Sequence, residues 1–343
     1  MTIRLGAGFF WTTEPFHEFA GLLEEAEQLG YDTLWLANEK FFHDMYVMAT
    51  VAAERSTNAR IGTFIADPYT HHPALTAMAI GSLDEVSDGR AILCIGAGGT
   101  GFPPMGIQRV KPALAIKEAI LLIRELLAGK TVNFEGEIIK FKNGRLNFNP
   151  RADIPIIVAS RGDRVLQVGG EVADGVMIAT YAEPVGLRHA LSMVEQGAQR
   201  AGRKLSDLRV ISRVDACIHP DRQAAIEAVK PMVGVFLWTS YPDRTFVELV
   251  GLEVPAELEA IIAKRDYNLM KENTHLIPDS FVDKFCWAGT AEEVADKVTA
   301  VAEMGIHDIT FLAHAPEGES TRHTLIEFAR TVKPMVEERL RGQ

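Results

Sequence analysis

Residues 61–99 constrain the fold of this chain most tightly, because two short apolar runs flank a segment with helical spacing. The first run, IGTFIA, leads into the polar turn DPYTHHP, and the second, AILCIGAGG, ends in a glycine-rich loop. Short apolar runs are typical of buried strands, whereas apolar residues recurring every three or four positions are typical of a helix. The segment therefore predicts a parallel strand–helix–strand unit. Ligands of such folds bind beyond the carboxyl ends of the strands, where the turn and the glycines lie.

The same alternation extends along all 343 residues. Apolar runs suited to eight strands occur at residues 3–10, 33–37, 60–66, 91–95, 154–159, 175–178, 208–217 and 309–313. Helical patterns occur at residues 15–29, 73–86, 112–127, 164–172, 183–201, 222–233, 291–304 and 321–340. This alternation predicts an α/β protein with a parallel sheet, and eight repeats that close on themselves form a (β/α)8 TIM barrel. An open doubly wound sheet is the alternative.

Two segments interrupt the alternation. Residues 132–148 alternate apolar and polar side chains around Asn143-Gly144, which predicts a β-hairpin after the helix at residues 112–127. Residues 234–285 combine Trp238, Tyr241 and Phe246 with several prolines and a helical stretch. We expect a helical insertion before the last strand, a position from which it can cover the barrel mouth as a lid. With both insertions included, residues 1–343 are expected to form a single domain.

The charge and composition of the chain limit the kinds of molecule that it can bind. The net charge of −11 opposes binding to nucleic acid or to anionic membranes, so a small organic molecule is the expected partner. No apolar run approaches the roughly 18 residues of a membrane span, and the first residues lack a basic region with a cleavage site, so a cytoplasmic location is expected. Cys94, Cys217 and Cys286 are odd in number and far apart, which indicates neither a disulfide framework nor a zinc knuckle.

The sequence ASRGDR at residues 159–164 joins a predicted strand to a predicted helix. Backbone N–H groups of Arg161, Gly162 and Asp163 at such a helix start attract an anion, and glycine lets a phosphate approach closely. A turn that needs glycine only for its shape is the alternative. Asp163 repels a phosphate unless its carboxylate points away to cap the helix.

A glycine-rich loop follows the fourth strand at residues 96–101. It is not the dinucleotide fingerprint, because the proline-containing segment FPPMG follows where a helix would have to begin. A loop without side chains offers a wall for a flat ring, or it supplies backbone conformations with positive φ. The residues expected to form this wall are Gly96, Ala97, Gly98 and Gly99, continued by Thr100 and Gly101.

Five phrases in order resemble the bacterial luciferase-like superfamily of flavin- and F420-dependent oxidoreductases, nearest to its methylenetetrahydromethanopterin reductase-like branch. They span nearly the whole chain and read GYDTLWLANE, ADPYTHHPALTAMAIGSLDEVSDGRAILCIGAGG, PALAIKEAILLIRELLAGKTVNFEGE, IPIIVASRGDRVLQVGGEVADGVMI and FCWAGTAEEVADKVTAVAEMGI. The resemblance implies a TIM barrel that binds a phosphate-bearing flavin-type cofactor. It also implies a tendency to form homodimers.

The resemblance assigns roles to particular positions. The turn after the fifth strand binds the cofactor phosphate in the family, and a non-prolyl cis peptide after the third strand forms a bulge behind the ring. The loop that follows contacts the ring edge or the cofactor tail, although hydrogen bonds that only shape the loop are equally plausible. The cofactor-binding residues expected on these grounds are Phe64, Ile65, Ala66, Asp67, His71, His72, Ala159, Ser160, Arg161, Gly162 and Asp163, with Tyr69 as a further polar candidate.

The end of the second strand is the expected site of proton transfer. Many F420-dependent relatives carry an Asp-His pair there, whereas this chain has Asn38-Glu39, so Asn38 and Glu39 are the candidate catalytic residues. Glu39 can take the role of acid or base, because burial beneath a ring raises the pKa of a carboxyl group. A structural glutamate paired with Lys40 is the alternative, and His43 and Asp44 are fallback candidates.

The resulting hypothesis is an oxidoreductase that transfers a hydride between coenzyme F420 and an organic substrate. An FMN-dependent monooxygenase or reductase is the first alternative. Two other classes stay open, a metal-dependent barrel hydrolase that uses His71, His72 and acidic residues, and a flavin-binding barrel without activity. Metal is disfavoured, because no H-x-H or H-E-x-x-H spacing occurs. The substrate is not specified: the aromatic insertion offers contacts to an apolar or aromatic group, whereas packing of Trp238 and Phe246 against the barrel is the commoner use of such side chains.

Overall fold

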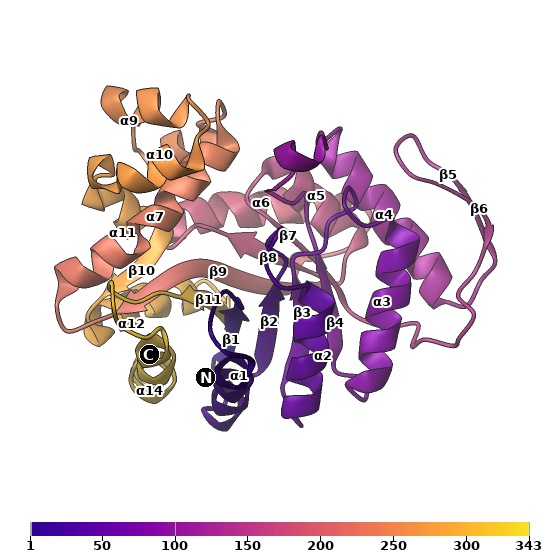
Figure 1. The fold of residues 1–343 in the computed structure, drawn as a ribbon, viewed down its shortest axis with the longest axis horizontal. Helices are drawn as coiled ribbons and strands as arrows, with labels where there is room; N and C mark the ends of the chain where they lie inside the picture. The colour runs from indigo at the N-terminus through magenta and orange to yellow at the C-terminus, as the bar shows by residue number, and fades with distance from the viewer. Residues whose placement is uncertain (1, 100, 343) are drawn as a thin grey trace. The chain divides into compact units, whose positions relative to one another are not determined.

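The computed structural model describes residues 2–99 and 101–342. The chain divides into two compact units (Figure 1). Unit 1 comprises Met1–Ala7, Ile178–Ala190 and Ile211–Gln343, and unit 2 comprises Gly8–Met177 and Leu191–Val210. The single domain expected from the sequence stays a prediction.

All eight predicted strands are confirmed, and their pairings follow the order of a TIM barrel. The strands are β1 Arg4–Phe9, β2 Thr33–Ala37, β3 Arg60–Phe64, β4 Ala91–Ile95, β7 Ile156–Ser160, β8 Gly175–Ala179, β9 Arg209–Ile218 and β11 Asp308–Ala313. The hydrogen-bonded order is β9-β11-β1-β2-β3-β4-β7-β8, and β8 pairs again with β9. This parallel (β/α)8 ring, rather than an open doubly wound sheet, is the fold of the chain.

A further strand, β10 Cys286–Gly289, pairs in parallel with the second half of β9. The sequence did not predict it, because its four residues directly follow a helix and carry no alternation. Its register places Cys286 opposite Asp215 and Gly289 opposite Ile218. A strand therefore directly follows the predicted helical insertion, which spans residues 234–285.

Helices follow most strands, as predicted. The α-helices other than the short ones of the aromatic insertion are α1 Phe16–Gln28, α2 Met45–Arg55, α3 Pro73–Val86, α4 Pro112–Leu127, α5 Asp163–Val172, α6 Pro184–Arg200, α7 Arg222–Ser240, α12 Ala291–Ala302, α13 Arg322–Glu327 and α14 Lys333–Arg341. Helix α2 was not predicted, because Val47 lies exposed among its buried residues and weakens the amphipathic signal. Its start is marked by Asp44, whose carboxylate accepts the N–H groups of Tyr46 and Val47.

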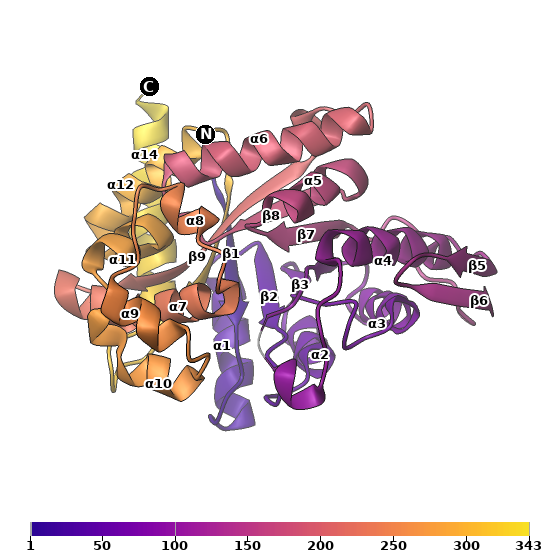
Figure 2. The same ribbon diagram turned by 90° about the horizontal axis from the view of Figure 1, so that it is seen from above.

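In unit 2 the strands β2, β3, β4 and β7 are consecutive parallel neighbours. Trp35 on β2 lies opposite Gly62 on β3 and is fully buried. A Cβ atom at Gly62 would lie 2.0 Å from the indole ring, so glycine is required there for the tryptophan to fit. Helices α2, α3, α4 and α5 cover the outer face of these strands, each beside the next (Figures 1 and 2).

The predicted hairpin is present, but its turn was misplaced. Strands β5 Val132–Glu135 and β6 Lys140–Gly144 pair so that Asn143 and Gly144 lie within β6, not in the turn. The turn forms at residues 136–139 because the buried carboxylate of Glu118 on α4 accepts N–H groups from Glu137, Ile138 and Ile139. A tertiary contact thus overrides the local preference of the Asn-Gly pair for the turn of a hairpin. The hairpin extends beyond α3 and α4 (Figure 2).

In unit 1 the aromatic insertion is helical, as predicted. Its helices are α8 Thr245–Glu248, α9 Ala256–Ile262, α10 Tyr267–Glu272 and α11 Asp279–Phe285, and α9 and α10 lie against α7 (Figure 1). Phe246 is 5% exposed, with its ring 5.3 Å from that of Phe285. Phe246 therefore packs within the insertion. The role of this insertion as a lid stays a prediction.

None of the helices in the described part of the chain has the length and apolar character that a membrane span needs. The cytoplasmic location stays a prediction.

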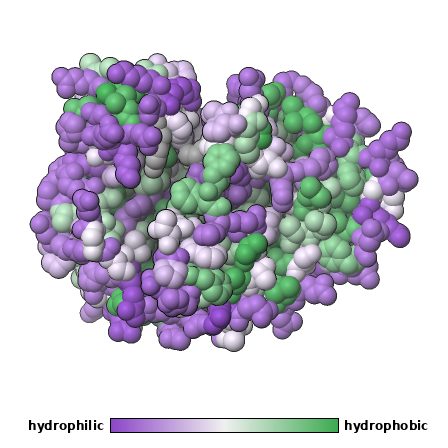
Figure 3. Space-filling model, in the orientation of Figure 1, coloured by the Kyte–Doolittle hydropathy of each residue, from purple (hydrophilic) through white to green (hydrophobic). Residues whose placement is uncertain are grey.

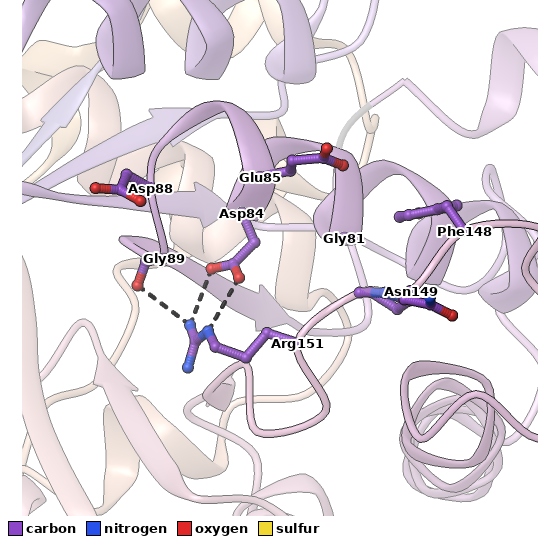
Figure 4. Close-up of a pocket in the computed structure, with 9 residues that line it drawn as sticks. Gly81, Asp84, Glu85, Asp88, Gly89, Phe148, Asn149 and Arg151 are labelled. Carbon is purple, nitrogen blue, oxygen red and sulfur yellow. Dashed lines mark hydrogen bonds and ion pairs between the residues drawn. The ribbon is translucent and has the colours of Figure 1, made fainter.

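A surface pocket of about 540 Å³ lies at the amino end of β4, opposite to the end at which TIM barrels carry their active sites (Figure 4). Arg151 closes one side of it with two bonds to the carboxylate of Asp84, at 2.9 and 3.0 Å, and a third to the carbonyl of Gly89. Asp84 is 4% exposed, and its carboxylate raises the pKa of Arg151. This ion pair joins the segment after the hairpin to α3 and is structural.

We predict that Arg151→Met lowers the free energy of unfolding by about 2 to 3 kcal/mol, because it leaves the buried carboxylate of Asp84 without a cation. Arg55→Met is the matched control, since Arg55 pairs with Glu24 on the surface of the same unit and such pairs contribute at most about 1 kcal/mol. Urea denaturation measures both. Equal losses in the two variants would contradict a structural role for the Arg151–Asp84 pair.

Candidate cofactor and active site

The residues predicted for the site all belong to unit 2 and follow the carboxyl ends of β2, β3, β4 and β7. These four strands are adjacent in the sheet, so the loops after them meet along one edge. The sequence prediction placed these residues at one edge because the carboxyl ends of parallel strands coincide.

The peptide bond between Phe64 and Ile65 is cis, as the family resemblance implied. Asn38 fixes this bulge from the neighbouring strand end: its backbone N–H donates to the Phe64 carbonyl at 2.8 Å, and its side-chain amide donates to the Ile65 carbonyl at 2.9 Å. The chain then returns to the sheet through Ala66, whose N–H donates to the carbonyl of Cys94. The observed contacts of Asn38, which was expected among the catalytic residues, are those of a residue that holds backbone.

Gly96 lies where the loop after β4 approaches both the Ile65 bulge and the end of β7. A Cβ atom there would lie 2.5 Å from Cδ1 of Ile65 and 2.8 Å from the carbonyl oxygen of Ala159. Glycine at this position therefore lets the Ile65 bulge and the end of β7 pack against the loop after β4. The space that the sequence assigned to a flat ring is occupied at Gly96 by the protein's own Ile65.

The rest of the glycine loop is partly covered in the same way. Gly98 has φ +66°, and a Cβ atom on it would lie 2.4 Å from the ring of Phe102. A Cβ atom at Gly99, by contrast, would meet nothing within 4 Å. The open part of the predicted wall is thus at Gly99. Ala97 lies between the two covered positions, and Thr100 lies outside the described residues.

A second loop, residues 102–111, folds back on this edge. The phenol of Tyr69 donates to the carbonyl of Val110 at 3.0 Å, and the exposed guanidinium of Arg109 donates to the carbonyl of Gly98 at 3.2 Å. The sequence reasoning did not include Arg109, because the FPPMG segment before it carries no motif. Arg109 places a positive charge beside the glycine loop, in a chain whose net charge is −11.

Asp67 is committed to contacts within the protein. Its carboxylate accepts N–H groups from Tyr69 and Thr70, the hydroxyl of Thr70, and the ammonium of Lys40 at 2.9 Å. Burial by itself raises the pKa of this carboxyl, but the hydrogen bonds from Lys40 and Thr70 outweigh it and hold the pKa below its usual value. The cation expected beside Glu39 therefore pairs with Asp67.

Glu39 and His43 follow the carboxyl end of β2, as expected, and lie in different surroundings within the loop before α2. Glu39 is partly buried, and its carbonyl accepts the N–H of Phe42. His43 is exposed, with its ring stacked on Trp11 at a centroid distance of 3.7 Å. Asp44, the second fallback candidate, is the cap of α2. Glu39 therefore remains the candidate acid or base.

The two adjacent histidines have separate structural partners. His72 caps α3 by accepting the N–H of Ala74 on Nδ1 at 3.2 Å, and its Nε2 lies 3.2 Å from the carbonyl of Lys140 on the hairpin. His71 stacks on Tyr46 at 5.9 Å. No group of three potential metal ligands from His, Cys, Asp and Glu occurs among residues 2–99 and 101–342.

The proposed phosphate turn begins α5, with Gly162 as its cap residue. The N–H of Gly162, expected to face the anion, donates instead to the hydroxyl of Ser160 at 2.9 Å. Asp163 is the first residue of the helix and not its cap. The turn nevertheless stands at a helix start, where the helix dipole favours an anion, and Arg161 lies within it.

A buried polar cluster in unit 1 was missed by the sequence reasoning. Asp215 on β9 is fully buried, accepts from Nε2 of His314 at 2.8 Å, and pairs with Arg213 at 3.0 Å. Burial alone would raise the pKa of Asp215, but Arg213 and His314 together hold it below its usual value. No motif indicated this cluster, because the three residues come from the middle of one strand and the end of another.

Comparisons with known proteins agree with this geometry. The 5,10-methylenetetrahydromethanopterin reductase of Methanolobus tindarius is 32% identical over 313 residues, which cover 90% of this chain and 93% of that protein. The F420-dependent glucose-6-phosphate dehydrogenase of Microbacterium testaceum is 23% identical over 99% of both chains. The structure of the coenzyme F420-dependent tetrahydromethanopterin reductase from Methanopyrus kandleri superposes with a TM-score of 0.83 at 26% identity, covering 97% of this chain and 99% of that one.

A sequence model of the luciferase-like monooxygenase family matches residues 4–308, which is most of the chain. This match and the relative at 32% identity agree with the resemblance inferred from the five sequence phrases. The chain belongs to the luciferase-like monooxygenase family.

Proposed function

We propose that the protein is an oxidoreductase that binds coenzyme F420 and transfers a hydride between its deazaflavin ring and a small organic substrate. The observation that carries the proposal is the convergence of the Ile65 bulge, the glycine loop and the α5 turn at one sheet edge. The F420-dependent proteins among its relatives support this choice over FMN. The family also includes monooxygenases by name, which keeps FMN as the alternative cofactor.

The residues present fit such a cofactor. The Ile65 bulge and the open side of Gly99 offer a surface with few side chains, and the start of α5 attracts a phosphate. Arg109 adds a cation that favours an anionic cofactor tail. When bound, F420 supplies the ring carbon that accepts or donates the hydride.

The chain itself would orient the reactants, exclude water and move one proton. Asn38 holds the bulge in place through the Ile65 carbonyl. Glu39, at the neighbouring strand end, would hold or release the proton at a carboxylate oxygen as the substrate gains or loses a hydride. Rigid placement of this group matters, because misplacement by about 1 Å can reduce a rate about a hundredfold.

We also propose that the protein forms a homodimer. Leu75, Met78 and Val86 on α3 are each 46–47% exposed, and Val47 on α2 is 56% exposed. Hydrophobic residues are visible at the surface over this region of unit 2 (Figure 3). Exposed apolar side chains gathered on adjacent helices favour burial against another protein surface.

The first prediction concerns the cofactor. We expect purified protein to quench F420 fluorescence with a lower Kd than it shows for FMN, because the relatives that it resembles use F420. NAD(P)H alone should not reduce a substrate, since the glycine-rich loop at residues 96–101 is followed by the FPPMG segment and not by the helix that a dinucleotide fingerprint requires. Isolation of a yellow protein with stoichiometric FMN and no affinity for F420 would reverse the assignment.

The phosphate turn is tested at Gly162. Its φ of −85° suits any residue, and a Cβ atom there would meet only Ser160 Oγ at 3.7 Å. We expect Gly162→Asp to weaken F420 binding about tenfold to a hundredfold by charge repulsion, without loss of folding stability. Gly162→Asn has the same size without the charge and should change the Kd less than about threefold. An unaltered Kd in well-folded Gly162→Asp would show that the phosphate binds elsewhere, and equal losses in the Asp and Asn variants would contradict charge repulsion as the cause.

The role of Glu39 is tested by Glu39→Gln, which keeps the size of the side chain and removes its ability to exchange a proton. General acid–base catalysis contributes about 10² to 10⁴ in rate, so kcat should fall by that order while the Kd for F420 stays nearly constant. F420-dependent turnover can first be assayed with 5,10-methylenetetrahydromethanopterin, which relatives use by name. A loss of less than about tenfold would remove Glu39 from the mechanism.

A further inference from the structure

A buried ion pair fastens the loop after β2 to the turn after β3. Nζ of Lys40 lies 2.9 Å from Oδ2 of Asp67, and the two side chains are 13% and 1% exposed. Asp67 is itself anchored by the N–H groups of Tyr69 and Thr70. A pair this far from solvent is screened little, so its two ends hold their positions more strongly than a surface pair does.

The loop after β4 packs against the same lysine. A Cβ atom at Gly101 would lie 2.3 Å from Cβ of Lys40 and 3.6 Å from the ring of Phe41. Gly101 has φ +76°, so glycine meets both the conformational and the steric demand of this contact. Lys40 is therefore the residue at which the loops after β2, β3 and β4 meet.

The residues on either side of Lys40 in the chain show which loop the contact of the three segments holds in place. Glu39, the candidate acid or base, precedes it. Phe41 follows it with φ +71°, a backbone conformation that a bulky residue adopts only where its surroundings impose it, and with a side chain that is 71% exposed. The loop thus keeps an unfavourable backbone conformation directly beside the anchored lysine.

We propose that Lys40 is a positioning residue: its ion pair with Asp67 holds the Glu39–Phe41 loop at the cofactor edge. This inference rests on the proposed function, because it places Glu39 for proton transfer. Lys40 acts through the backbone of the loop, and its ammonium is engaged by Asp67.

The first test measures the loop itself and needs no substrate. In Lys40→Met we expect hydrogen–deuterium exchange of the peptide covering residues 38–44 to rise at least tenfold, with no change over residues 156–170. The double variant Lys40→Met/Asp67→Asn removes the unpaired buried carboxylate, so folding stability should recover while the loop stays loose. Lys40→Arg keeps the charge and should restore protection of the loop. Unchanged exchange in residues 38–44 of Lys40→Met would overturn the proposal.

The second test is a double-mutant cycle between Lys40→Met and Glu39→Gln. If Lys40 acts by placing Glu39, Lys40→Met lowers kcat by about tenfold to a hundredfold and leaves the Kd for F420 within about threefold. The double variant should then be no slower than Glu39→Gln alone, because a misplaced glutamine loses nothing further. Independent, multiplying losses would overturn the proposal.

Arg55→Met serves as the control in both tests, since its surface ion pair with Glu24 lies in the same unit and away from the site. It should alter neither loop exchange nor kcat. The assay uses F420 with 5,10-methylenetetrahydromethanopterin as the probe. Failure of the wild-type protein to bind F420 would refute the proposed function, whereas normal binding with an unchanged loop in Lys40→Met would refute only the role of Lys40.

Discussion

The parallel pairing of β2, β3, β4 and β7 is the constraint on which the candidate site depends. Each strand ends at the same edge, so residues far apart in sequence, such as Asn38 and Ile65, meet without any long-range loop. The close approach at Gly96 sets how tightly these loops can pack, because any larger residue would collide with Ile65 and with the Ala159 carbonyl. Sheet geometry brings the loops together, and the absence of one side chain lets them touch.

The fold could be predicted from the sequence where one physical signal dominated. Buried parallel strands read as continuous apolar runs, and all eight barrel strands were found on that basis. The misses occurred where tertiary contacts decided the outcome. The turn of the hairpin is set by Glu118 and not by Asn143-Gly144, and β10 is a strand through its pairing with the second half of β9. Neither partner is recognisable from the residues of the element itself.

The same distinction applies to the site. Its position followed from topology and from the family resemblance, but the partner of each polar side chain did not. Lys40, expected as a partner of Glu39, pairs with Asp67, and His72, expected to contact the cofactor, caps α3. Several side chains named as candidate ligands therefore make contacts that shape the loops. The sequence of one loop shows which residue types lie at the sheet edge. The hydrogen bonds of these residues depend on which neighbouring loops pack against it.

This division of labour explains how an acidic chain can present an acid or base beside an anionic cofactor. Asp67 forms an ion pair with Lys40, and the side chain of Asp44 caps the start of α2. Two carboxylates near this edge therefore have structural roles. Arg109 and the start of α5 supply positive potential at the positions proposed for the cofactor tail. Glu39, the proposed acid or base, directly precedes Lys40 in the chain, so the Lys40–Asp67 ion pair and the Asp44 cap both fix the loop that carries it.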